Sequence, residues 1–402
     1  MSDQFAPCAV VELRRYTLHP GRREELIELF EREFVESQEA AGMRLIGQFR
    51  DLDDPDRFVW LRAFPDMESR GRALAAFYDG PIWARHRDAA NATMVDSDDV
   101  LLLRAASGPP AFGRPVERPP LGAGAGGPSP VVVVATICPL PDGPDERFVE
   151  FFDDQVRPLL LEAGGLPIAC LRTEVAANTF PRLPVRTDEH VFLWLAAFPT
   201  EERYREHLAE LERSATWAQV VRPELERRLA GPARRLRLQP TARSLLGQPG
   251  DAHDFDFVAG RWTVANRRLR RRGQGCDEWD EFPGTHHGWL LLGGIANVDE
   301  MACPARGFSG MSVRAFDPAA GRWSISWISS LRGVPEPPLV GDFCGDHGEF
   351  FGDDVDEGRP VRVRFRWDRV GADAARWAQA FSYAGGPWET NWVMEFSRPP
   401  SG

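Results

Sequence analysis

Two spacings of apolar side chains alternate along the N-terminal part of the chain. The pattern of residues 10–16 predicts a strand. In residues 24–38, apolar side chains recur every three to four positions, which predicts a helix with one apolar face. Further segments are predicted at residues 43–49 and 57–64 (strands), 67–91 (helical) and 100–104 (strand). The predicted element order is therefore β-α-β-β-α-β, the plan of a ferredoxin-like α+β sheet.

A second copy of this pattern follows the first. The octapeptide FVWLRAFP at residues 58–65 returns as FLWLAAFP at residues 192–199, an offset of 134 positions, and Trp83 and Trp217 keep that offset. Anchors earlier in the two copies are only 122 positions apart, so the second copy contains an insertion of 12 residues near residues 177–188. Because the order of elements is the same in both copies, we infer an internal duplication.

Each predicted copy leaves one apolar face of its sheet without helices, and that face needs cover. The two copies, at residues 8–106 and 131–239, can cover each other. Residues 107–130 between them are rich in proline and glycine, a composition that favours a linker over a helix or strand. We therefore expect a pseudo-dimeric α+β barrel within one chain.

The last domain, predicted at residues 251–398, has short segments of alternating apolar and polar side chains and almost no helical period. Turn residues separate these segments, for example DPAAG at residues 317–321. An all-β domain of this length is expected to form a closed antiparallel barrel or a sandwich. Its predicted strands are residues 261–269, 307–316, 322–329, 361–367, 376–381 and 388–396.

Composition excludes several classes of function. The chain has no lysine, which rules out Schiff-base chemistry and a P-loop lysine, and its formal net charge of -12 supplies no basic field for nucleic acid. The six cysteines form no CxxC pair, and no segment is typical of a signal peptide or a membrane span. We therefore expect a soluble, cytoplasmic protein without nucleic-acid or membrane partners, whose two repeats pair within the chain and which could also form a homodimer.

Histidine is the usual candidate for a metal ligand, and the chain has eight. His286 and His287 are adjacent, so on a strand they face opposite sides and cannot share a metal. His86 follows Trp83 on a predicted helix, where a haem ligand could lie, but its counterpart in the second copy is Val220. We therefore predict neither a metal site nor a bound cofactor.

Tryptophan is concentrated in the last domain. Nine of the 13 tryptophans lie between residues 262 and 392, enough either to fill a barrel core or to line an aromatic cavity. We predict that a small, mainly apolar or aromatic molecule binds there. The predicted ligand-binding residues are Trp262, Trp279, Trp289, Asn297, Trp327, Trp377, Gln379 and Trp392.

An enzyme is the competing interpretation, namely a cofactor-free oxygenase, isomerase or cyclase of specialised metabolism. Its candidate catalytic residues are His287 and Asp299, an imidazole and a carboxylate that could transfer a proton. Alternatively, Arg14, Tyr16 and Trp60 could line a pocket in the first copy, although they could equally face the other half. A third possibility is an interaction scaffold without a ligand.

The two copies resemble a known family. ELRRYT at residues 12–17, with Pro20, Gly21 and Trp60, resembles the NIPSNAP family of dimeric α+β barrels. The second copy is a more divergent relative, because ATI at residues 135–137 replaces the Arg-Tyr pattern. This resemblance implies the barrel fold and no settled reaction.

The last domain resembles an uncharacterised lipocalin-like family of bacterial proteins. FVAGRW at residues 257–262 is similar to the start of lipocalin-like barrels, and the motifs at residues 278–282, 293–300 and 388–392 extend the resemblance. The family motif WEQAF reads WAQAF here, so Ala378 replaces a glutamate and no role of that glutamate transfers. The resemblance implies a barrel without a known reaction.

Overall fold

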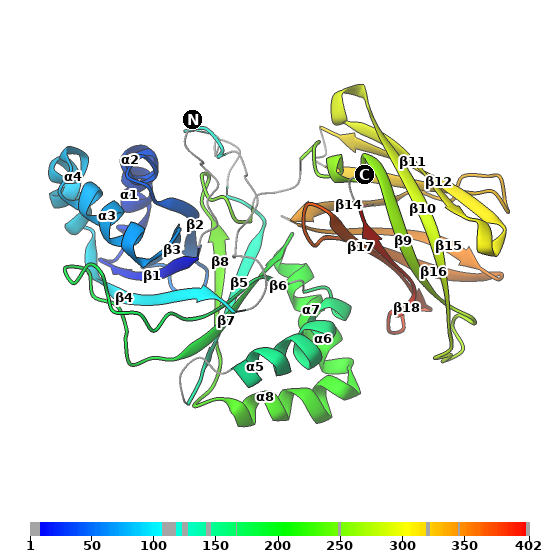
Figure 1. The fold of residues 1–402 in the computed structure, drawn as a ribbon, viewed down its shortest axis with the longest axis horizontal. Coiled ribbons are helices and arrows are strands. Elements are labelled where there is room, and N and C mark those ends of the chain that lie inside the picture. The colour runs from blue at the N-terminus through cyan, green and yellow to red at the C-terminus, as the bar shows by residue number, and fades with distance from the viewer. Residues whose placement is uncertain are drawn as a thin grey trace. The chain divides into compact units, whose positions relative to one another are not determined.

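The chain divides into two compact units, Met1–Gln248 and Pro249–Gly402. They are drawn in Figure 1 from a computed structural model. Most of the predicted linker, 107–130, lies outside the described part of the chain. No helix in the described residues is long and apolar enough to cross a membrane. The structure describes residues 9–106, 118–122, 128–141, 146–165, 167–247, 251–318, 322–344 and 346–398.

The first unit is a closed eight-stranded barrel with the strand order β1-β3-β2-β8-β5-β7-β6-β4. Each copy contributes four strands, and the copies join where β2 pairs with β8 and where β4 pairs with β6. The two junctions are reciprocal, because each joins the second strand of one copy to the fourth of the other. The strands are β1 (Val10–Leu18), β2 (Arg44–Asp51), β3 (Arg57–Phe64), β4 (Met94–Ala105), β5 (Val132–Pro139), β6 (Pro167–Thr173), β7 (Val191–Phe198) and β8 (Arg234–Pro240).

Helices of both copies bury one apolar face on the outside of this barrel. The helix predicted at residues 24–38 is continuous but contains a π-helical turn at Phe30–Phe34, and the second copy has the same turn at Phe152–Val156. Phe30 packs on Trp60, with ring centroids 4.9 Å apart. The α-helices are α1 (Arg23–Leu29), α2 (Val35–Ala40), α3 (Met67–Tyr78), α4 (Pro81–Asn91), α5 (Glu146–Phe151), α6 (Arg157–Glu162), α7 (Glu201–Arg213) and α8 (Arg222–Arg228).

The second unit is a closed barrel of ten antiparallel strands, in the order β10-β11-β12-β13-β14-β15-β16-β17-β18-β9. The prediction of a closed barrel is confirmed, and each of the six predicted strands coincides with an observed one. The strands are β9 (Gly260–Leu269), β10 (Trp279–Leu291), β11 (Ala296–Cys303), β12 (Phe308–Asp317), β13 (Arg322–Ser329), β14 (Leu339–Cys344), β15 (His347–Asp356), β16 (Arg359–Arg369), β17 (Ala374–Tyr383) and β18 (Glu389–Ser397).

Four strands, β10, β11, β14 and β15, were not predicted, because residues that usually end strands lie inside some of them. β10 contains Pro283, Gly284 and Gly288. A Cβ atom at Gly288 would lie 2.3 Å from the carbonyl oxygen of Val258, so only glycine allows the segment before β9 to pack against β10. Close packing of two backbones thus explains a glycine that the sequence pattern alone presents as a break.

That segment closes one end of the second barrel. Phe255 is completely buried, and its ring meets those of Trp323 at 5.0 Å and Phe343 at 4.9 Å. A 3₁₀ helix at Asp256–Val258 follows and leads into β9. Phe255 and the 3₁₀ helix at Asp256–Val258 together form an apolar plug at this end of the barrel.

We predict that Phe255→Ala lowers the free energy of unfolding of the second barrel by about 3–5 kcal/mol, because it removes a buried ring without replacing its contacts. Urea unfolding followed by tryptophan fluorescence measures this change. Val370→Ala, at an exposed turn position, is the control and should change stability by less than about 0.5 kcal/mol. Equal effects of both variants would contradict the role of the plug.

Candidate functional site

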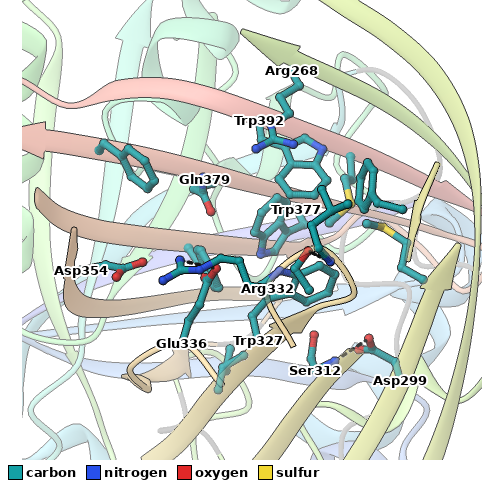
Figure 2. Close-up of a pocket in the computed structure, with 18 of the residues that line it drawn as sticks. Arg268, Asp299, Ser312, Trp327, Arg332, Glu336, Asp354, Trp377, Gln379 and Trp392 are labelled. Carbon is teal, nitrogen blue, oxygen red and sulfur yellow. Dashed lines mark hydrogen bonds and ion pairs between the residues drawn. The ribbon is translucent and has the colours of Figure 1, made fainter. Parts of the chain in front are cut away.

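The second barrel encloses a cavity of about 230 Å³. Its middle is aromatic: the indole of Trp392 meets that of Trp377 edge-on at 5.5 Å and that of Trp327 at 6.3 Å. A Cβ atom at Gly310 would lie 2.1 Å from Trp327, so this glycine makes room for the indole inside the barrel. Figure 2 shows these three indoles between Arg268 on one side and Asp299 on the other.

Charged side chains surround the end of the cavity that lies opposite the plug. Arg268 lies with its guanidinium carbon 4.8 Å from the centre of the Trp392 ring, and burial together with nearby Arg272 lowers its pKa. Arg272 binds Asp356 at 2.6 Å. Burial, with a contribution from Asp354, raises the pKa of Glu336. A ligand entering here would therefore pass both cationic and acidic groups.

A buried polar cluster lies nearer the plugged end. Asp299 on β11 forms an ion pair with Arg314 on β12, and its Oδ2 lies 3.3 Å from Nε2 of His286 on β10. The backbone N–H of Ser312 donates to Asp299 Oδ1 at 3.2 Å, and Arg314 donates to the Asn297 amide oxygen at 3.0 Å. All five residues are buried. The strand register explains the assembly, because Asp299 lies opposite Ser312 and Asn297 lies opposite Arg314.

Electrostatics fixes the charge of this cluster. Burial opposes ionisation of Asp299, but the Arg314 charge and the contact with His286 outweigh it and lower the pKa to about 2. The guanidinium of Arg314 lies 4.9 Å from the centre of the Phe255 ring. This cation–π contact stabilises the positive charge that pairs with Asp299. The carboxylate is therefore ionised at neutral pH.

The cluster also has unused hydrogen-bonding capacity. Nδ1 of His286, Nε of Arg314 and Nδ2 of Asn297 are buried and have no hydrogen-bond partner in the described residues. Buried polar atoms of this kind are rare in proteins. His286 and Arg314 line the cavity, so a ligand there could supply an acceptor.

The structure brings together some of the predicted site residues. Trp327, Trp377, Gln379 and Trp392 line the cavity, as does Asp299. The cavity is further lined by Met301, Phe308, Ser312, Ile325, Ser329, Leu331, Arg332, Val355, Phe365, Trp367, Phe381, Met394 and Phe396.

Two further predicted residues lie beside the cavity. Trp262 is buried against Phe396, and Asn297 reaches the cluster through Arg314.

Other predicted residues lie on the outer face of β10. Trp289 is 43% exposed and stacks on His287 at 4.1 Å, while Trp279 lies under the guanidinium of Arg267. These three residues share one side of the strand, and the cavity-lining imidazole belongs to His286 instead. Of the two adjacent histidines, His286 lines the cavity, whereas the predicted candidate His287 lies on the outer face.

The hydrophobic pattern of the sequence did not predict Arg314 as a site residue, because in β12 polar side chains face inward and apolar side chains face outward. Its inward positions are Gly310, Ser312 and Arg314, whereas Met311 and Val313 are more than a third exposed. A rule that places apolar side chains inside would reverse this strand. The lone arginine among small inward residues is the only signal in the sequence.

The sequence predicted neither a metal site nor a haem site. No group of three His, Cys, Asp or Glu side chains within the described ranges could hold a metal ion. Nε2 of His86 lies 3.5 Å from Glu33, and its ring packs on Phe34. The predicted absence of both remains a prediction.

Comparison with known families bears on the first unit. The NIPSNAP family model matches residues 11–109, which span the first copy. These residues form a NIPSNAP domain. An uncharacterised NIPSNAP-like domain protein from Burkholderia xenovorans is 29% identical, and the match covers 27% of this chain and 90% of that one with a TM-score of 0.23. The NIPSNAP match ends before the second copy begins.

Two other solved structures are more distant. An anthrone oxidase-like protein is 14% identical over 59% of this chain and 93% of its own, with a TM-score of 0.38. A phycobiliprotein lyase from Guillardia theta is 11% identical over 37% of this chain and 92% of its own, with a TM-score of 0.26. No curated protein matches the chain.

The Asp299 cluster of the second barrel should change how the stability of the protein depends on pH in acid. A carboxylate whose pKa falls from 3.8 to about 2 on folding stabilises the native state above pH 4, and the effect is lost as the pH falls towards 2. The stability advantage of the wild type over Asp299→Asn should therefore shrink by about 2 kcal/mol between pH 5 and pH 2. Urea unfolding across this range measures it. Asp353→Asn, at an exposed position, is the control, and parallel pH curves for wild type and Asp299→Asn would contradict the assignment.

Proposed function

We propose that the C-terminal barrel binds a small, flat, mainly aromatic molecule that carries one hydrogen-bond acceptor. The observation that carries this proposal is an aromatic cavity that ends at buried donors without acceptors. A cavity of about 150 Å³ can hold benzene, so about 230 Å³ suits a molecule of one or two rings. The indoles would contact its faces, and His286 or Arg314 would bind a phenolate, ketone or similar oxygen.

Support also comes from the shape of the site. Phe255 packs beside Arg314 near one end of the cavity, and Arg268, Arg272 and Glu336 line its wall elsewhere, so we infer that a ligand would enter past these charged side chains. The lipocalin-like assignment of residues 251–398 belongs to this proposal, because barrels that bind a ligand in their interior share this architecture.

We predict that Ser312→Leu abolishes binding of one-ring and two-ring phenols, because the added side chain points into the cavity. Val313→Leu, the next residue on the outer face of β12, is the matched control and should bind as the wild type does. Quenching of tryptophan fluorescence during titration with a phenol library measures both. The proposal fails if no member of the library perturbs the wild type, or if Ser312→Leu binds with unchanged affinity.

A second candidate function is cofactor-free proton transfer, as in an isomerase or cyclase. The specific observation is the pair of His286 and Asp299, which places an oriented imidazole in the wall of the cavity. Asp299 would stabilise the imidazolium that forms when His286 accepts a proton from a bound carbon acid.

This candidate predicts that the wild-type protein exchanges a C–H proton of a bound ligand with deuterated water. His286→Gln, whose amide can still donate a hydrogen bond to the ligand, should keep ligand affinity within a few-fold. It should lose at least about 100-fold in exchange rate, the usual contribution of a general base. Mass spectrometry of the recovered ligand measures the exchange. Equal exchange in both proteins would leave the barrel a binding site only.

A further inference from the structure

The NIPSNAP domain contains a second buried charge cluster, remote in sequence from the cavity. The carboxylate of Glu12 on β1 accepts hydrogen bonds from Arg14 at 2.9 Å, Arg62 at 2.7 Å and Arg70 at 2.6 Å. All four side chains are completely buried. They lie between the sheet and its helices, because β1 and β3 contribute Glu12, Arg14 and Arg62, and α3 contributes Arg70.

Positive charge exceeds negative charge in this cluster. The other partners of the arginines are neutral: Arg14 donates to the Tyr16 hydroxyl, and Arg62 donates to the Gln38 amide oxygen. Burial opposes ionisation of Glu12, yet the three guanidinium groups lower its pKa well below the ordinary value. One carboxylate therefore faces three cations, and buried charge without compensation is strongly unfavourable.

Some donors of the cluster have no acceptor. Nη2 of Arg62, Nη2 of Arg70 and Nε1 of Trp60 are buried without a hydrogen-bond partner in the described part of the chain. The guanidinium of Arg62 lies 5.0 Å from the centre of the Trp60 ring. Two of the unused donors thus belong to guanidinium groups, which pair strongly with carboxylates.

The second copy shows that the fold does not need these charges. Glu12 pairs with Arg62 across β1 and β3, and the corresponding pair in β5 and β7 is Val134 with Ala196. At the offset of 134 positions, Arg70 corresponds to Tyr204. Val134, Ala196 and Tyr204 form a small apolar core with Val132 and Phe198. The same scaffold therefore closes with an apolar cluster where the first copy keeps four charged side chains.

An insertion in the second copy covers the cluster. The connection between β6 and β7, residues 174–190, reaches the first copy beside α3 (Figure 1). There Asn178 and Thr179 accept hydrogen bonds from Arg70, and the ring of Phe180 stacks on Tyr78 at 6.0 Å. Thr179 is exposed, so this connection separates Arg70 from solvent.

We propose that this cluster is a binding site for a small aromatic carboxylate, with the β6–β7 connection as its cover. The carboxylate would accept hydrogen bonds from the free Nη2 groups of Arg62 and Arg70 and balance the excess positive charge. Trp60 and Tyr78 would contact the ring of the ligand. The site is independent of the proposed function of the C-terminal barrel.

The test uses the full-length protein and 4-fluorobenzoate, followed by ¹⁹F NMR at constant ionic strength. The wild type should bind it saturably, whereas 4-fluorobenzamide, which has the same shape without the charge, should bind at least about tenfold more weakly. Inorganic phosphate as a competitor separates recognition of a carboxylate from recognition of any small anion. Displacement of 4-fluorobenzoate by an equal concentration of phosphate would overturn the assignment to an aromatic carboxylate.

The decisive variant transfers the apolar cluster of the second copy into the first. Glu12→Val, Arg14→Thr, Arg62→Ala and Arg70→Tyr together should leave a folded protein and abolish binding of 4-fluorobenzoate. Ser312→Leu, which blocks the C-terminal cavity, should leave this binding unchanged, so failure of one site is distinguishable from failure of the other. Arg87→Ala, at an exposed position of α4, controls for loss of a positive charge.

Besides displacement by phosphate, three outcomes with these proteins would overturn the proposal. They are an absence of saturable binding to the wild type, unchanged affinity in the fourfold variant, and loss of binding in Ser312→Leu. If the fourfold variant does not fold, as judged by circular dichroism, the single variant Arg70→Tyr decides. Its affinity must then fall at least about tenfold, and unchanged affinity would overturn the proposal.

Discussion

A buried guanidinium group must have an anionic or hydrogen-bonding partner, and both barrels are organised around this constraint. In the C-terminal barrel one arginine, Arg314, is matched by one carboxylate, Asp299, and the pair fixes the polar end of the cavity. In the NIPSNAP domain three arginines share Glu12. The first arrangement is balanced in charge, and the second is not, which is why the two sites are expected to attract different ligands.

The two copies combine a similar scaffold with different chemistry. The two copies share strand order, reciprocal junctions and even a π-helical turn at corresponding positions. They differ beneath the helices, where one has charges and the other has Val134, Ala196 and Tyr204. The second copy also supplies the connection that covers the charges of the first. The first copy thus has the charges, and the second copy has the insertion that covers them.

The sequence predicted the parts of the fold that follow from the local periodicity of apolar and polar side chains. The repeated octapeptide marked β3 and β7, and alternation located six strands of the second barrel. Interior positions were harder to predict, because Gly288 and Gly310 are small for reasons of close packing that only the fold reveals. The inward face of β12 is polar, so neither Arg314 nor its pairing with Asp299 could be derived from hydrophobicity. On β10, the sequence could not decide which of the two adjacent histidines faces inward. His286 lies opposite Met301 of β11 and Trp262 of β9, and this pairing assigns it to the interior.

The proposed function requires that the aromatic cavity of the C-terminal barrel holds a small molecule. Native mass spectrometry of the full-length protein purified from its own host, beside the same sample after denaturation, shows whether it does. We expect an extra mass of one small aromatic molecule that is lost on denaturation and absent from the Ser312→Leu protein. A bare polypeptide mass, both as purified and after incubation with a metabolite extract of the host, would contradict it.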